Sequence, residues 1–260
     1  QSQSGVAGET YGPLLESVYE ELTASLGLGP PRVSVIVYTE ADLRRAYNQR
    51  DWAIGFYDGR LRIRADELST AAGRALVAHE LTHGVIDYSS GLIYENESGA
   101  LNEAFSDVMA IAAEFHFQPR GTGPQRADYL IGEDVVTPGG IRSADNPTVF
   151  SEPDHYSRRY RGNEDNGGVH VNASIASHVY YLAIEGGTNR TSQLSVTGVG
   201  AANRAQIEKA FYRAFTQLMR ANSTFGTARA ATLQAARDLF GAASAAERAI
   251  AEAWTAVGGE

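Results

Sequence analysis

The stretch from Val77 to His83 reads VAHELTH and restricts this chain more than any other part of its sequence. On a helix, His79 and His83 lie one turn apart on the same face, because residues i and i+4 are neighbours there. Their ring nitrogens can therefore hold one metal ion. Glu80 lies about 100° further round the helix, where it can reach a metal-bound water but cannot act as a third ligand. The alternative is a chance match in a surface helix, which the small number of histidines, six, disfavours.

A second helix, predicted from Glu97 onward, contains a candidate third ligand. Two imidazoles leave a catalytic metal site one protein ligand short. Glu103 and Asp107 share a face of this helix, so Glu103 can bind the metal while Asp107 fixes a ligand imidazole. The alternative is two solvated acids on an exposed face. Ser98 is predicted to cap the helix, and its apolar stripe is formed by Leu101, Phe105, Val108 and Ala112.

Composition excludes several classes of protein. The chain has 260 residues, a net charge of −9 and no cysteine. The negative charge argues against nucleic acid or an anionic membrane as a partner. Without cysteine there is no disulfide, thiol nucleophile or cysteine-based zinc site. No apolar run is long enough to span a bilayer. The chain begins at Gln1 without a signal peptide, which leads us to expect a processed, mature form.

The order of the predicted elements is mixed at first and helical later. Before the motif, we expect a helix over residues 10–26, a strand over 32–38, and a hairpin of strands 52–57 and 61–64 around Asp58-Gly59. The motif helix covers residues 71–88. Residues 117–169 show few regular signals, which is typical of a functional loop region. The last third predicts helices over residues 172–184, 205–219, 228–239 and 245–257.

The stretch VAHELTHGVIDYSSGLIYENESGALNEAFSDVMA closely resembles the active-site region of the thermolysin-like neutral zinc metallopeptidases, or gluzincins. The resemblance continues through residues 152–160 and 165–170 and covers about residues 70 to 260. It implies a two-lobed α+β zincin fold. A small mixed α/β N-terminal lobe (residues 1–90) would hold the edge strand and the HExxH helix. A mainly helical lobe (91–260) would follow, with the active-site cleft between the two. The N-terminal lobe is much shorter than is usual in the family.

The resemblance also implies roles for individual residues. His79, His83 and Glu103 match the zinc ligands. Tyr94 and His170 match the residues that donate hydrogen bonds to the oxyanion, since charge develops on the carbonyl oxygen as water attacks. The alternatives are an ordinary core or surface tyrosine and a satisfied loop histidine. Two further residues match supporting positions: Asp165, which orients His170, and Asn102, which bonds the second zinc histidine or its backbone.

Substrate contacts are matched less evenly. Arg142 matches the arginine that holds the substrate carbonyl beyond the scissile bond; the alternative is a surface arginine in a loop shorter than the family's. The pocket for the residue after that bond is matched by four apolar side chains, which predict a preference for bulky hydrophobic residues: Leu76, Ile131, Val135 and Ile141. An edge strand should pair with the substrate backbone, and its candidate residues are Asn48, Ala53 and Gly55.

Calcium ligands are matched only in part. Glu114, Asp128 and Glu133 correspond to acids of the family's double calcium site, whereas Ala75 and Leu130 stand where two further acids would be. Three carboxylates with carbonyl groups and water can hold one calcium ion. We therefore expect one structural calcium, the alternative being a solvated acidic patch without calcium.

Together with the resemblance, these residues predict a monomeric zinc endopeptidase that acts on protein or peptide substrates with Glu80 as general base. The resemblance implies that it is secreted and made with its own pro-segment. A catalytically weak protein that binds peptides or an inhibitor is the second hypothesis. The presence of Glu80, Tyr94 and His170 argues against it, because binding alone needs no general base. A zinc aminopeptidase is the third, and it is disfavoured because no exopeptidase anchoring element is visible beside the motif.

Overall fold

The computed structural model describes residues 35–38, 55–57, 61–64, 71–123, 125–133 and 139–259. The helix expected over residues 10–26 lies outside these ranges. So do three of the candidate substrate contacts: Asn48, Ala53 and Val135.

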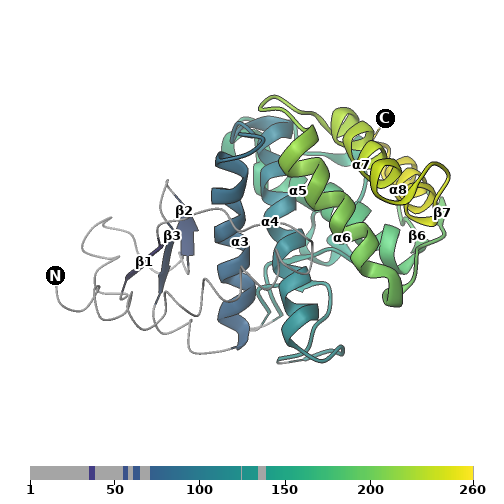
Figure 1. The fold of residues 1–260 in the computed structure, drawn as a ribbon. Helices are drawn as coiled ribbons and strands as arrows, with labels where there is room; N and C mark the ends of the chain where they lie inside the picture. The colour runs from purple at the N-terminus through teal and green to yellow at the C-terminus, as the bar shows by residue number, and fades with distance from the viewer. Residues whose placement is uncertain are drawn as a thin grey trace.

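A three-stranded sheet precedes the motif helix. Its strands β1 (Val35–Tyr38), β2 (Gly55–Tyr57) and β3 (Leu61–Arg64) have the order β1-β3-β2. β1 is parallel to β3, whereas β2 is antiparallel to β3, with Gly55 opposite Ile63. The predicted hairpin is therefore confirmed. Among the described strands β2 forms one edge of the sheet, and it lies beside the motif helix α3 (Ala71–Asp87), as Figure 1 shows.

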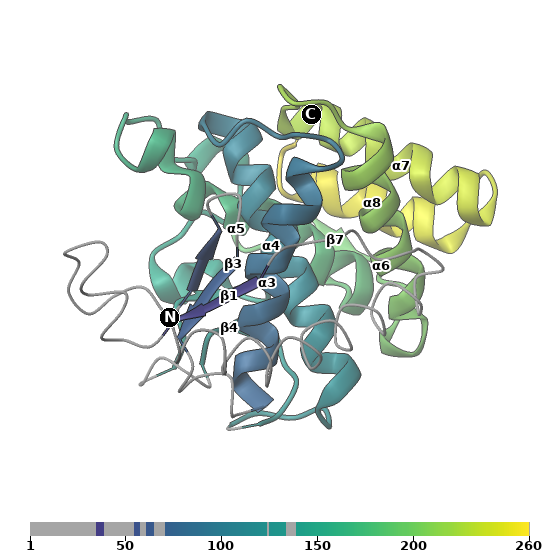
Figure 2. The same cartoon turned by 60° about the vertical axis from the view of Figure 1, so that its left-hand side comes forward.

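Helix α4 (Asn96–Phe117) lies at the centre of the molecule. It packs against α3 on one side and against α5 (Asp165–Glu185) on the other, while the sheet lies on the far side of α3 (Figures 1 and 2). All residues from Gly99 to Glu114 are buried, as expected for a helix covered on every side. The predicted apolar stripe is thus in the core. Buried polar groups need partners. The buried polar residues of this helix therefore indicate a functional site where they contact one another or a ligand.

The predicted cap of α4 is wrong. The helix is preceded by Glu95 in an extended conformation, and Ser98 lies within its first turn. There the Ser98 hydroxyl donates to the carbonyl oxygens of Ile93 and Glu95, at 2.7 and 2.8 Å. Serine commonly bonds nearby backbone carbonyls in this way, so a capping residue type alone does not place the start of a helix.

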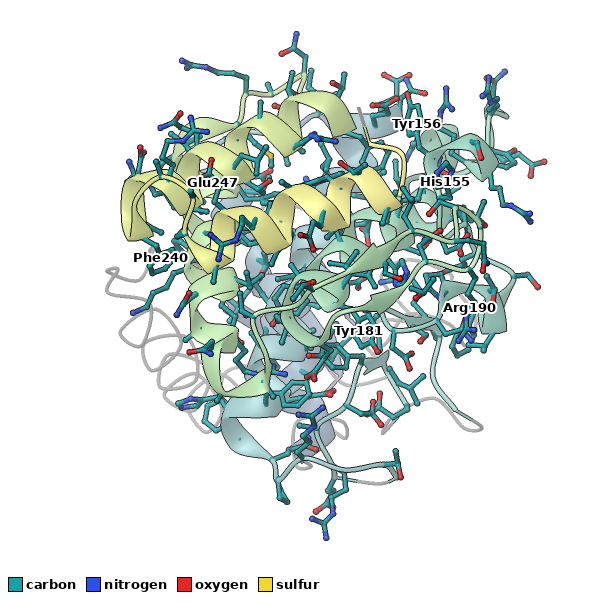
Figure 3. The ribbon with its side chains drawn as sticks, turned by 90° about the vertical axis from the view of Figure 1, so that its right-hand side faces the viewer. His155, Tyr156, Tyr181, Arg190, Phe240 and Glu247 are labelled. Carbon is teal, nitrogen blue, oxygen red and sulfur yellow. The ribbon has the colours of Figure 1, made fainter. Side chains whose placement is uncertain are left out.

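The C-terminal helices form the largest part of the apolar core. Helix α6 (Arg204–Arg213) continues into a π-helical turn, η4 (Ala214–Leu218), and is followed by α7 (Phe225–Phe240) and α8 (Ala245–Ala256). Phe105 of α4 stacks on Phe215 at a centroid distance of 4.7 Å, and Trp254 is fully buried. The final residues close over this core, since Tyr156 donates its backbone N–H to Val257, beside the end of α8 (Figure 3).

Between α4 and α5, the residues that the structure describes form only short elements. The strands β4 (Leu130–Ile131) and β5 (Arg142–Ser143) pair antiparallel, and two 3-10 turns follow, η1 (Pro147–Phe150) and η2 (Tyr156–Arg158). A further strand pair and a 3-10 turn precede α6: β6 (Gly187–Thr188), β7 (Ser195–Val196) and η3 (Ala201–Asn203). None of the described helices has the length and apolar character needed to cross a membrane. The predicted α+β class, with a small sheet and a mainly helical C-terminal part, is confirmed.

Candidate active site

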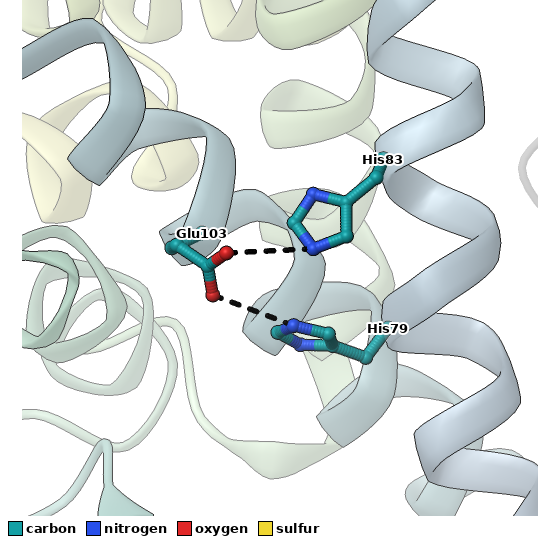
Figure 4. Close-up of side chains that lie close together, drawn as sticks. All are labelled: His79, His83 and Glu103. Atoms are coloured by element: carbon teal, nitrogen blue, oxygen red, sulfur yellow. Dashed lines mark ion pairs between the residues drawn. The ribbon is translucent and has the colours of Figure 1, made fainter. Parts of the chain in front are cut away.

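Three metal-ligating side chains converge between α3 and α4. His79 and His83 project from α3 toward Glu103 of α4 (Figure 4). The two His Nε2 atoms lie 3.4 and 3.5 Å from the Oε2 and Oε1 atoms of Glu103, respectively. One ligand atom from each residue lies within 4.8 Å of the others, and no other such group of three occurs in the part of the chain that the structure describes.

The imidazoles lie on the face of α3 that packs on α4. Ile86, three residues after His83 on the same face, belongs to the core cluster with Leu101 and Phe105 of α4. Val77, Leu81 and Val85 are also buried, but each lies two residues from a histidine, about 200° round the helix, so they cover the opposite face. Both faces of α3 are thus covered, and the face with Ile86 directs His79 and His83 toward Glu103.

Each imidazole faces a side-chain oxygen with its other ring nitrogen. The Nδ1 atom of His79 lies 3.1 Å from Oδ1 of Asp107, and Nδ1 of His83 lies 2.6 Å from Oδ1 of Asn102. Asn102 donates its own Nδ2 to the carbonyl oxygen of Leu92 at 3.2 Å, so its Oδ1 is the acceptor. The His83 proton therefore belongs on Nδ1, which leaves the Nε2 lone pair directed at the shared point.

Two residues near the ligands were not predicted from the sequence. The Ser106 hydroxyl lies 3.2 Å from Nδ1 of His83; its position four residues after Asn102, on the same helical face, was the available signal. Glu152 lies near enough to Arg142 and Asp107 for their charges to act on it, and burial raises the pKa of its carboxyl to about 8. No local pattern in the sequence pointed to Glu152.

The charges of the cluster suit a divalent cation. Within the described residues, Oε2 of Glu103 is buried without a hydrogen-bond partner, which is costly for a carboxylate oxygen. Burial alone would raise the pKa of Glu103, but His83 and His79 outweigh it and lower the pKa well below its usual range. Burial would lower the pKa of His79, yet the carboxylates of Asp107 and Glu103 raise it to about 10. Two imidazole nitrogens and one carboxylate that face a common point are the ligand types of a catalytic zinc site.

Glu80 is buried beside the ligands on α3. Burial is the main cause that raises the pKa of its carboxyl, to about 7. A carboxylate with a pKa near neutrality can both accept and return a proton at physiological pH. Its place on the helix keeps it out of the ligand set, as the spacing predicts.

Tyr94 and His170 reach the same site from different parts of the chain. The Tyr94 hydroxyl donates to Oε1 of Glu103 and lies 3.2 Å from Nε2 of His170. That Nε2 is itself 3.5 Å from Oε1 of Glu103. Burial and the charge of Glu103 raise the pKa of Tyr94 far above its usual value, so the phenol stays protonated and remains a donor. The Tyr94 hydroxyl and the Nε2 atom of His170 therefore lie beside the metal ligands, where both can form hydrogen bonds.

Asp165 partners His170, and both belong to the start of α5. Oδ1 of Asp165 lies 2.7 Å from Nδ1 of His170, and Oδ2 accepts the backbone N–H of His170 at 2.9 Å. The sequence predicts this helix only from residue 172, and it places His170 in a loop. His170 instead lies in the first turn of regular helix, directly after a tight turn at Asn166, Gly167 and Gly168.

Arg142 forms an ion pair with Asp107. Its guanidinium donates from Nε to Oδ2 at 2.8 Å and from Nη2 to Oδ1 at 2.6 Å, and it is buried. Nη2 is also 3.7 Å from Oε2 of Glu103. Arg142 is therefore not a surface arginine.

The candidate pocket residues lie around the short β4–β5 ladder and on α3. The ladder places Ile131 opposite Arg142, and the Ile141 N–H donates to the Ile131 carbonyl at 2.8 Å. Ile131 is buried, Ile141 is exposed, and Leu76 is half-buried on α3, one turn before Glu80. Gly55 belongs to the edge strand β2, beside the same helix.

The side chains of the three calcium candidates do not form a compact ligand group like that of the zinc candidates. Glu114, Asp128 and Glu133 do not form a three-membered ligand group of the kind found at His79, although all three are described. Oδ1 of Asp128 accepts the backbone N–H of Leu130 at 2.8 Å. Calcium binding stays a prediction from the resemblance.

Comparison with known proteins agrees with this geometry. Residues 90–258 match the family described as "Thermolysin metallopeptidase, alpha-helical domain". Bacillolysin from Bacillus caldolyticus is 43% identical over 195 residues, which are 74% of this chain and 34% of that protein. Bacillolysin from Bacillus cereus is 45% identical over 194 residues, 73% of this chain and 32% of that protein. The chain thus spans about a third of the length of these curated relatives.

A solved structure has a similar fold. The structure titled as the precursor of protealysin, a metalloproteinase from Serratia proteamaculans, has a TM-score of 0.68 and 22% identity. The match covers 100% of this chain and 80% of that one, and at this identity it speaks for the fold alone. The fold and the site geometry together match the zincin fold class. From the family match and its relatives, the chain belongs to the thermolysin metallopeptidase family.

Proposed function

We propose that this chain is a secreted zinc-dependent endopeptidase that hydrolyses peptide bonds in proteins. The observation that carries the proposal is the convergence of His79, His83 and Glu103, with the buried Glu80 on the same helix. Membership of the thermolysin metallopeptidase family supports it. Among the described residues, no contact favours the peptide-binding or aminopeptidase alternatives.

His79, His83 and Glu103 would hold the zinc ion, which when bound lowers the pKa of water and polarises the substrate carbonyl. Glu80 accepts the proton of the attacking water, since its own pKa of about 7 lets it exchange protons readily. The same carboxyl then returns the proton to the leaving nitrogen. Tyr94 and His170 donate hydrogen bonds to the carbonyl oxygen as it becomes negatively charged.

The surrounding elements would position the substrate. The edge strand β2 can pair with an extended peptide through Gly55 and its neighbours. Ile131, Ile141 and Leu76 would form an apolar pocket, which favours bulky hydrophobic residues after the scissile bond. Arg142 would bind the substrate carbonyl beyond that bond with the part of its guanidinium that Asp107 leaves unused.

Further features are proposed on the family resemblance. They are one structural calcium ion, a monomeric state, secretion, and a pro-segment in the precursor. The structurally similar protealysin is itself titled as a precursor.

Metal analysis combined with two glutamate variants tests the proposed function. Purified without chelator, the protein should contain about one zinc per chain. Glu80→Gln should retain that zinc and lose cleavage of casein by at least about 10²-fold, because only the proton acceptor is removed. Glu103→Ala should lose zinc itself. As a matched control, Glu95→Gln changes an exposed acid near the site and should alter neither. Absence of zinc, or normal cleavage by Glu80→Gln, would refute the proposal.

A further inference from the structure

The backbone immediately before His170 is wound in the unfavourable, left-handed direction. Asp165, Asn166, Gly167 and Gly168 have φ values of 52°, 49°, 88° and 80°. Two of these four are not glycine, and L-residues in this region cost free energy unless their surroundings impose it. Contacts around the turn must therefore hold it in place.

The left-handed turn determines where the His170 imidazole lies. It brings the Asp165 carboxylate back over the start of the helix, where one oxygen accepts the His170 N–H and the other faces His170 Nδ1. Both contacts, at 2.9 and 2.7 Å, depend on the path of the backbone between the two residues. If the turn relaxes, Asp165 moves away from His170, and Nε2 of His170 no longer points at the site.

Asn172 ties this turn to the preceding segment. Only 4% of its surface is exposed, so its amide must find partners inside the protein. Its Oδ1 accepts the Tyr160 N–H at 2.8 Å, and its Nδ2 donates to the carbonyl oxygens of Tyr160 and Gly167 at 3.1 and 3.4 Å. One side chain thus joins the helix that carries His170, the turn before it and the segment at Tyr160.

The two glycines of the turn fit between neighbours that would reject a larger residue. A Cβ atom added to Gly167 would lie 2.3 Å from Oδ1 of Asn96, at the start of α4. One added to Gly168 would lie 2.6 Å from Cδ1 of Tyr160. The turn is therefore enclosed between α4, which carries Glu103, and Tyr160, which Asn172 fixes.

We propose that Asn172 is a positioning residue for His170. It acts by holding the left-handed turn at residues 165–168 against Tyr160, so that Asp165 keeps the imidazole directed at the zinc ligands. The inference rests on the proposed function, in which His170 donates to the oxyanion. A buried amide that does not touch the substrate would then control the turnover rate.

Asn172→Asp tests this role, because it keeps the acceptor for Tyr160 and removes both donated hydrogen bonds. Turnover should fall by roughly 10-fold to 100-fold, the scale for a misplaced catalytic group, with KM and zinc content unchanged. The matched control is Asn189→Asp. Asn189 is also buried and donates to the carbonyl oxygen of Asp154 at 2.7 Å, but it takes no part in the turn. This control should lower the melting temperature without lowering turnover per folded, zinc-loaded molecule.

A double variant separates positioning from general damage. In a His170→Ala background, Asn172→Asp should change turnover less than about 2-fold, since non-additivity marks residues that act through one another. An equal loss in both backgrounds would overturn the proposal. If Asn172→Asp fails to fold, Tyr160→Ala serves instead. It removes the ring beside Gly168 from a half-buried position and should also lower turnover only when His170 is present.

A spectroscopic measurement keeps this inference distinct from the proposed function. In protein labelled at histidine, the His170 ring signals should shift in Asn172→Asp and stay unchanged in Asn189→Asp. A wild-type protein without peptidase activity would refute the proposed function, yet the same spectra would still report on the positioning of His170. Unchanged His170 signals in Asn172→Asp would overturn the inference even if the enzyme is active.

Discussion

Arg142 and Asp107 form a buried, two-pronged ion pair, with N–O distances of 2.8 and 2.6 Å. Paired bonds of this kind fix orientation as well as charge. Oδ1 of Asp107 also faces Nδ1 of His79 at 3.1 Å. The Asp107 carboxylate therefore contacts both Arg142, which is proposed to bind substrate, and His79, a proposed zinc ligand. The position of Arg142 thus depends on that of His79.

Asp107→Asn should weaken zinc binding by about 10-fold to 100-fold, the usual cost of removing a carboxylate behind a ligand histidine. The loss arises because His79 is no longer held and made more basic by a charged partner. Competition with a zinc chelator measures the affinity. Asp145→Asn, an exposed acid just beyond β5, is the control and should leave the affinity unchanged. Equal affinity in Asp107→Asn and wild type would exclude this role for Asp107.

His170→Ala and Tyr94→Phe should each lower the maximal cleavage rate by roughly 10² to 10³, the scale for losing one oxyanion donor. Zinc content should stay at the wild-type level, because neither residue is a proposed ligand. Steady-state kinetics on a peptide substrate, with parallel metal analysis, measure both quantities. A variant that binds peptide less tightly but reaches the normal maximal rate would make the residue a binding group instead.

The part of the site that follows from local geometry could be predicted from residue spacing alone. His79, Glu80 and His83 belong to one helix, and Glu103 and Asp107 belong to another. Helical periodicity therefore determines which of these residues share a face. The meeting of these helices, by contrast, results from tertiary packing. No periodic pattern connects Tyr94, Arg142 or His170 to the motif, and only the family resemblance suggested their roles.

Other features had weak or misleading local signals. Asn166-Gly167-Gly168 indicates a turn, but its left-handed path and its link to Asn172 depend on contacts with Tyr160 and Asn96. Two-residue strands such as β4 and β5 are too short to show alternation, so the ladder beside Arg142 was not predicted. Glu152 lies near the site only because the segment after β5 folds back toward α4.

Calcium should stabilise the protein if the acids matched to the family's calcium site bind it. For zinc-loaded protein, calcium at about 100 times its dissociation constant should raise the melting temperature by roughly 5–10 °C, by linkage. Thermal unfolding across a calcium titration measures the shift. Glu114→Gln should reduce it, and magnesium at equal concentration should not reproduce it. A melting temperature that does not change with calcium would refute the calcium site and leave the zinc site unaffected.

His178 should make stability depend on pH in a defined direction. The imidazole is buried on α5, where its Nδ1 donates to the carbonyl oxygen of Ala144 at 2.8 Å and its ring stacks on Tyr181. Burial lowers the pKa of His178 in the folded protein, whereas in the unfolded chain it should be near the usual value of about 6.5. The unfolded state then binds more protons below about pH 6.5, so the contribution of His178 to the free energy of unfolding is lost as the pH falls through that range.

His178→Asn isolates this contribution, because other groups titrate in the same range. Glu80 and Glu152 have raised pKa values and oppose the effect, but they are present in both proteins and largely cancel in the difference. The asparagine amide keeps a donor for Ala144 and cannot take up a proton. Denaturant unfolding of both proteins between pH 5 and pH 8 (about one and a half units either side of the imidazole value) should show the wild-type advantage shrinking toward acid pH. A constant difference across that range would mean that His178 is protonated equally in the folded and unfolded states, which its buried position does not allow.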